Sequence, residues 1–163
     1  MLESYVEKWP TPQIENFRYM LRSGMLGWLT IMTDTNAWSA DQHAEARKEI
    51  DLYKNELRPL IRDASLYHVS PRPDGVHWDG IQYWDPERKR GVVYAFRGTI
   101  ARETTHSFVL EGLEPTGRYG LKFYDHSAPD RTVTGRELLG TGLKVTLPLQ
   151  NSSELIFVEE LAH

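Results

Sequence analysis

The residues best suited to bind a ligand follow the apolar stretch that ends at Met32. A short polar loop there contains Asp34, Asn36 and Trp38. A tryptophan ring can cover the apolar C–H face of a sugar, and carboxylate and amide groups can hold its hydroxyl groups. The loop therefore has residue types that suit a carbohydrate site. The alternative needs no ligand: Asp34 and Asn36 shape a turn, and Trp38 packs on the helix that follows.

A second candidate lies in the stretch 77–85, which reads HWDGIQYWD. Side chains alternate along an extended strand, so Trp78, Gln82 and Trp84 share one face. On an exposed face, two tryptophans and an amide would make a platform for carbohydrate. On a buried face the same residues would be core aromatics, and Asp85 would open the hairpin turn that follows.

The two carboxylates on this stretch cannot work together as acid and base. Asp79 and Asp85 are six positions apart, which in an extended strand is roughly 20 Å. The paired carboxylates of a glycosidase lie only about 5 to 10 Å apart. The histidines follow no metal-ligand spacing, and no nucleophile, phosphate-binding or dinucleotide motif occurs. We therefore expect no metal, no cofactor and no catalysis by this chain alone.

The composition of the chain excludes several classes of binding partner and of chemical site. The chain has 163 residues, a net charge of -4 and no cysteine, so disulfides and thiolate sites are excluded. Its basic residues are scattered, which argues against nucleic acid. No segment reaches transmembrane length, and residues 1–10 contain no core suited to a signal peptide. The location stays open between the cytoplasm and secretion, and the lack of cysteine and of a visible signal favours the cytoplasm.

The N-terminal part reads as helix, strand, helix. Apolar residues at helical spacing predict a helix over Gln13–Arg22, and the apolar run Met25–Met32 predicts a strand buried on both faces. Ser39 and Gln42 form a capping box that should start a long helix over Asp41–Arg58.

The long helix should carry one apolar face and one solvated face. The apolar stripe consists of Ala46, Ile50, Tyr53, Leu57 and Leu60. Glu45, Lys48, Glu49, Asp51 and Lys54 are expected on the solvated face. Pro59 should end or kink the helix at about Arg58, because it removes a backbone donor.

From about residue 65 the chain reads only as short strands and turns, typical of an antiparallel sandwich. The expected strands are Leu66–Val69, Gly80–Trp84, Val92–Arg97, His106–Leu110, Tyr119–Tyr124, Leu143–Leu147 and Leu155–Glu159. We therefore predict a mostly β fold in which residues 65–163 form an antiparallel β-sandwich.

Residues 1–64 contain one expected strand, and one strand cannot form a sheet. We interpret this part as the helix–strand–helix remnant of a (β/α)8 barrel. Its apolar residues should then leave an exposed patch through which the chain could form a homo-oligomer. The residues expected there are Ile14, Phe17, Met25, Leu29 and Ile31.

Taken together, the N-terminal part and the expected sandwich resemble the C-terminal region of family 36 α-galactosidases. The barrel-strand motif of that family matches Arg22, Ser23, Met25 and Gly27; the next motif matches Trp38 and Ser39; the helix motif matches Ile50, Tyr53, Lys54, Arg58 and Pro59. The stretches WDGIQYWDPERKRGVVYAFRG and TGRELLGTGLKVTLP look like the β-sandwich of the same group.

The resemblance implies a retaining glycosidase that acts on α-galactosides through two aspartates, both upstream of this chain. It implies that Gly27 and Trp28 lie near the substrate, and Asp34 and Trp38 are candidates for the same site because they follow the carboxyl end of the expected strand. The family often has Cys-Gly where this chain has Leu26-Gly27, and Trp28 replaces a small residue, so the sugar preference stays open. The chain would then be the C-terminal fragment of an α-galactosidase-like hydrolase. The alternative is a non-catalytic carbohydrate-binding or accessory sandwich with Trp78 and Trp84 as its platform.

Overall fold

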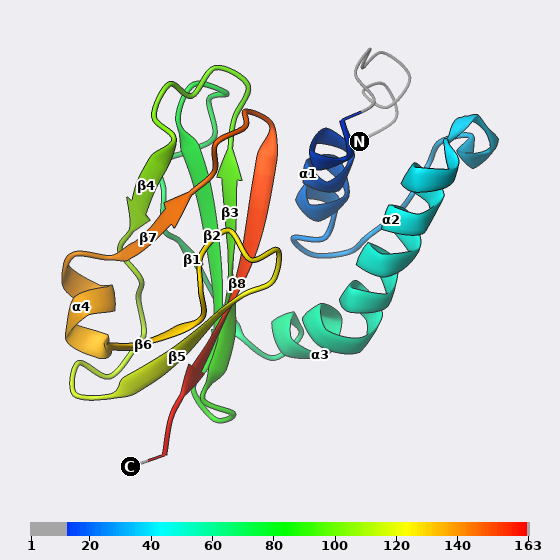
Figure 1. Cartoon of the computed structure of the whole chain (residues 1–163). Coiled ribbons are helices and arrows are strands. Elements are labelled where there is room, and N and C mark those ends of the chain that lie inside the picture. Colours follow the sequence, from blue (N-terminus) through cyan, green and yellow to red (C-terminus); the bar gives the residue numbers. More distant parts are fainter. Residues whose placement is uncertain (1–12, 163) are drawn as a thin grey trace.

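The computed structural model describes residues 13–162, and the residues examined above for a signal peptide lie outside this range. Figure 1 shows a large β-sheet with a layer of helices on one side and a small second sheet on the other. The strands of the large sheet run antiparallel in the order β1-β2-β3-β8-β5-β6. Their bounds are β1 Ser65–His68, β2 Trp78–Asp85, β3 Arg90–Arg97, β8 Ser152–Glu160, β5 Arg118–Phe123 and β6 Arg131–Thr134.

The second sheet pairs β4 (Thr105–Phe108) with β7 (Leu143–Thr146). Together with helix α4 (Gly135–Gly140) it covers the inner face of the large sheet. Apolar side chains from both sheets and from α4 form one buried cluster between them. The mostly β, antiparallel sandwich expected from the sequence is confirmed, and every strand expected after residue 65 forms.

Strand β6 and helix α4 were not expected from the sequence. The helix is short, so its apolar periodicity is weak, but its N-cap carries a readable signal. The Thr134 side chain accepts a hydrogen bond from the Glu137 backbone N–H at 3.2 Å, the arrangement that a T-x-x-E sequence predicts.

The helical layer consists of α1 (Ile14–Gly24) and a long bent helix. The latter comprises α2 (Ala40–Leu52), a π-helical turn η2 (Tyr53–Leu57) and α3 (Arg58–Ile61). The Ser39–Gln42 capping box is present at its start. The expected apolar stripe packs with α1 against the outer face of the large sheet in a second buried cluster, which includes Tyr94 and Leu155.

Of the two outcomes expected at Pro59, an end or a kink, the helix does not end there. The helix continues to Ile61 because the chain widens into the π-helical turn Tyr53–Leu57 just before the proline. A wider turn accommodates both the missing donor and the ring, which would clash with a carbonyl in a regular α-helix.

The strand expected over Met25–Met32 does not form either. Met25 is the C-cap of α1, residues 26–28 are bends, and the run pairs with no strand among the described residues. A strand needs hydrogen-bonded neighbours, and an apolar run alone does not supply them. Nor is the run buried on both faces, since Trp28 is 91% exposed and Met32 is 60% exposed.

The expected apolar patch is also smaller than the sequence suggested. Phe17 and Met25 are buried against α2 and the sheet, and Ile14, Leu29 and Ile31 are half-buried in the same cluster.

Candidate functional site

Three tyrosines hold the chain where it leaves α1. Tyr94, Tyr83 and Tyr53 donate their hydroxyl groups, in that order, to the carbonyl oxygens of residues 25, 26 and 27. The first two come from the sheet and the third from η2, where it lies 2.5 Å from its acceptor. Burial raises the pKa of Tyr94 and of Tyr83, so these hydroxyls remain protonated donors. The segment is therefore fixed without belonging to a sheet.

Replacing Tyr53 with Phe should loosen this segment at a cost of about 1 to 2 kcal/mol in the free energy of unfolding, since the hydrogen bonds of its hydroxyl to the Gly27 carbonyl oxygen and from the Leu29 N–H are both lost. The Leu29 N–H, which lies 3.4 Å from the Tyr53 hydroxyl, should then exchange faster with solvent. Hydrogen exchange and chemical denaturation measure the two effects. Tyr67→Phe is the matched control, because the Tyr67 hydroxyl has no hydrogen-bond partner within residues 13–162. We call the hydroxyl groups of Tyr53, Tyr83 and Tyr94 the tyrosine anchor. Equal exchange rates at Leu29 in both variants would contradict its role in holding this segment.

The four residues predicted to lie near substrate occur along one loop but do not converge. Asp34 is exposed and accepts hydrogen bonds from the Asn36 N–H at 3.0 Å and from its side-chain amide at 2.9 Å, so it shapes a turn. Trp38 packs edge-on against Phe17 at 5.0 Å between ring centroids. Gly27 and Trp28 are exposed, and Trp28 lines a different hollow from the one that Trp38 lines. This arrangement is the turn-and-packing alternative for Asp34 and Trp38.

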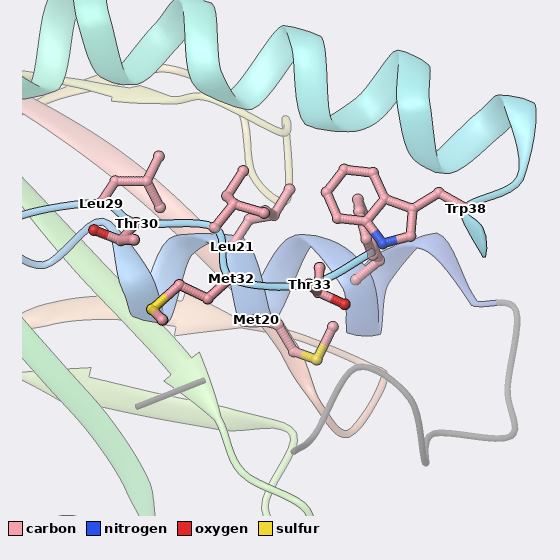
Figure 2. A pocket seen from close by; sticks show the side chains of 9 residues that line it. Met20, Leu21, Leu29, Thr30, Met32, Thr33 and Trp38 are labelled. Atoms are coloured by element: carbon pink, nitrogen blue, oxygen red, sulfur yellow. The ribbon is translucent and has the colours of Figure 1, made fainter. Parts of the chain in front are cut away.

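A small cavity lies between this loop and α1 (Figure 2). Leu29, Met32 and Trp38 line it from the loop, and Met20 and Leu21 line it from α1. Its volume of about 30 Å³ holds one or two water molecules. Its lining is almost wholly apolar and contains no acid or base, so the cavity by itself neither fits a sugar nor supports hydrolysis.

The residues of the alternative platform are buried. Trp78 and Trp84 are each 3% exposed and lie between the two sheets. The indole N–H of Trp78 donates to the Glu103 carbonyl oxygen at 3.0 Å. A platform needs exposed ring faces, so the structure favours the core-aromatic alternative for this strand.

Gln82, the third residue of that face, is 2% exposed and has a structural role. Its amide N–H donates to the Glu111 carbonyl oxygen at 2.8 Å, and its amide oxygen accepts from the Glu111 N–H at 2.9 Å. The side chain thus completes the backbone hydrogen bonding of a neighbouring loop.

A buried cluster of charges joins the helical layer to the sandwich, and the sequence did not reveal it. Arg22 is fully buried at the end of α1. Its guanidinium donates to both carboxylate oxygens of Glu49, at 2.9 and 2.8 Å, and to Asp125 in the loop after β5. Glu49, expected on the solvated face of its helix, is therefore also fully buried. Arg18 extends the cluster through an ion pair with Glu45.

The loop that presents Asp125 is itself held by a carboxylate. Glu154, on β8, has no exposed surface. Its side chain accepts hydrogen bonds from the N–H groups of Asp125 at 2.9 Å, Ser127 at 3.0 Å and Leu155 at 2.9 Å. The two charge-assisted bonds from Asp125 and Ser127 fix the loop and hence the position of the Asp125 side chain.

This cluster predicts acid sensitivity. Burial alone would raise the pKa of Asp125, but the hydrogen bond and charge of Arg22, with further help from Arg18 and Lys48, lower it overall. A carboxyl whose pKa is lower in the folded state contributes stability above its unfolded pKa, and that stability is lost as the pH falls through the folded value. The denaturant concentration at the midpoint of unfolding should therefore decrease as the pH is lowered below about 4. The decrease should be less steep in Asp125→Asn. Identical pH profiles for both proteins would contradict this role.

Neither a metal centre nor a membrane span emerges from residues 13–162. No group of three or more histidine, aspartate or glutamate side chains there is placed to hold a metal ion. None of the helices is both long enough and apolar enough to cross a bilayer.

Comparison with protein-family models gave no match, and comparison with curated proteins gave none. The fold, however, matches solved structures. The α-galactosidase from Lactobacillus brevis matches with a TM-score of 0.68 and 19% sequence identity, over 88% of this chain and 20% of that one. The GH36 α-galactosidase AgaA from Geobacillus stearothermophilus, solved with 1-deoxygalactonojirimycin, matches with a TM-score of 0.64 and 16% identity over 88% and 19% of the two chains. A structure of AgaA with raffinose matches with a TM-score of 0.62. The chain thus spans about one fifth of the length of these enzymes.

Proposed function

We propose that this chain is the C-terminal region of an α-galactosidase-like glycoside hydrolase. The observation that carries the proposal is the fold match, which covers 88% of this chain but 20% of the matched α-galactosidase. At 19% identity the match establishes the fold, so the activity rests on the resemblance of the motifs as well. The remaining four fifths of such an enzyme would supply the barrel and the catalytic aspartates.

Within this proposal the chain divides near residue 64. Residues 1–64 complete the barrel, and residues 65–163 form the sandwich that supports them. The exposed side chains of Trp28 and Met32 then face the rest of the barrel, and the tyrosine anchor and the Arg22 cluster hold this surface in place. Beside the other strands of a barrel, the run Met25–Met32 would gain the partner strands that it lacks among the described residues.

The substrate contacts belong to the same proposal. Gly27, Trp28, Asp34 and Trp38 would line the rim of the sugar site, and an α-galactoside would be the substrate of the complete enzyme. Chemistry would proceed through a covalent glycosyl-enzyme intermediate formed on an upstream aspartate. This chain would help to position the substrate and to shape the sugar site, and it would transfer no proton.

The chain alone should not hydrolyse an aryl α-galactoside. Its candidate cavity contains no carboxylate, and removal of the catalytic pair removes the whole reaction. Release of the coloured phenol by the purified chain measures the rate, with buffer alone as control. Turnover above the buffer rate would show that the catalytic groups are present and would overturn the proposal.

The exposed apolar surface also makes the isolated chain a candidate to form homo-oligomers. Sedimentation over a range of concentrations would detect association through Trp28, and Trp28→Ser would weaken it. The accessory-module alternative has no comparable support, because its platform tryptophans are buried.

A further inference from the structure

A second surface, on the outer face of the large sheet, has the features of a ligand site. A groove of about 670 Å³ lies between helix α2 with η2 and the strands β3, β5 and β8. Helix α1 packs against both α2 and β8, and the groove opens where the helical layer leaves the sheet uncovered. A second hollow of about 390 Å³ continues toward β6 and shares Lys122, Phe157 and Glu159 with the groove. These volumes are in the range of small-molecule sites.

The groove has an aromatic floor. Phe157, in the middle of β8, is half-buried and packs edge-on against Tyr124, with 6.3 Å between ring centroids. The Lys48 ammonium lies 5.0 Å from the centre of the Tyr124 ring, so this ring already makes a cation–π contact within the protein. The Phe157 ring is therefore the apolar surface that the groove offers to a ligand.

Polar side chains without protein partners surround this floor. Asp51 and Asn55 project from the helix, and Lys122 and Glu159 project from the sheet. All four are exposed, and their side chains make no hydrogen bond or ion pair with any described residue. They offer carboxylate acceptors, an ammonium donor and an amide that both donates and accepts.

The charged side chains that line the groove favour a neutral ligand. The groove is lined by three cations and three carboxylates, so they balance. One pair, Arg90 and Glu56, is already joined at 3.3 Å. A balanced lining attracts neither anions nor cations strongly, whereas one aromatic face with donors and acceptors of both kinds suits the hydroxyl groups and C–H face of a sugar.

We propose that the groove over Phe157 is a binding site for neutral oligosaccharide, separate from the loop 25–38. The inference does not depend on the proposed function, because it concerns binding by this chain alone.

Titration of the ¹⁵N-labelled full chain with raffinose, followed by NMR, tests the proposal. Saturable shifts are expected at the amides of Lys122, Phe157 and Glu159 and along residues 48–56. Phe157→Leu should weaken binding about tenfold, since the stacking face is lost while apolar bulk remains. Lys122→Ala, an exposed change, should weaken it without affecting the fold.

The control variant is Lys144→Ala, because Lys144 is also exposed but lies on β7 of the other sheet. This variant should bind raffinose as tightly as the unchanged protein does. Three results would overturn the proposal: no saturable shift, equal affinity in both groove variants and the control, or shifts confined to residues 25–38. Shifts with inorganic phosphate but not with raffinose would identify an anion site and would also overturn it. Loss of hydrolysis by a longer enzyme, by contrast, would bear only on the proposed function.

Discussion

Arg22→Met should destabilise the protein by about 3 to 5 kcal/mol, because it leaves a buried carboxylate without its partner. Arg22 and Glu49 have no exposed side-chain surface, and their two hydrogen bonds measure 2.9 and 2.8 Å. Methionine fills similar volume but neutralises nothing. Chemical denaturation followed by circular dichroism measures the change in the free energy of unfolding.

Two further variants separate the buried charge from a general effect of losing an arginine. Arg62→Met removes an exposed pair with Asp63 and should leave the midpoint nearly unchanged. The double variant Arg22→Met with Glu49→Leu should recover most of the loss, because an apolar pair replaces the ionic one. A loss in Arg22→Met no larger than that in Arg62→Met would refute the cluster as the link between helices and sandwich.

Gln82→Leu should cost about 1 to 3 kcal/mol, because two hydrogen bonds of a buried side-chain amide are lost. The variant keeps apolar volume at a site that is 2% exposed, yet the N–H and C=O groups of Glu111 lose their partners at 2.9 and 2.8 Å. Thermal unfolding gives the change in midpoint.

Gln150→Leu is the matched control for this variant. Gln150 is exposed, and its amide makes one long hydrogen bond of 3.4 Å to the Ala101 carbonyl oxygen. Its loss should stay within about 0.5 kcal/mol. If both variants unfold alike, Gln82 does not act through the backbone of Glu111.

Local patterns were enough to predict the sandwich. Strand β7 alternates Leu143 and Val145 inward with Lys144 and Thr146 outward, and such alternation determines both the element and its buried face. Parity likewise placed Trp78, Gln82 and Trp84 on one face correctly. Whether that face was exposed depended on the second sheet, which brings Phe108 against Trp78 from a distant part of the sequence.

The helical layer was predicted less well because its interactions are between distant residues. Glu49 carries no local sign of burial; its partner Arg22 comes from α1, and Arg22 also pairs with Asp125 in the loop after β5. The tyrosine anchor has the same origin, since Tyr94 and Tyr53 reach the segment from opposite sides. The run Met25–Met32 has the composition of a strand, but pairing requires neighbours that no periodicity can reveal.

The most direct test of the proposal is the length of the natural polypeptide that contains this sequence. Antibodies against the sandwich would isolate it from its source, and intact mass with peptide mapping would measure it. The account predicts one chain about five times as long, in line with the 20% of the matched enzyme that is covered here, together with hydrolysis of an aryl α-galactoside. A polypeptide of 163 residues that is stable without any larger chain and inactive on that substrate would contradict it.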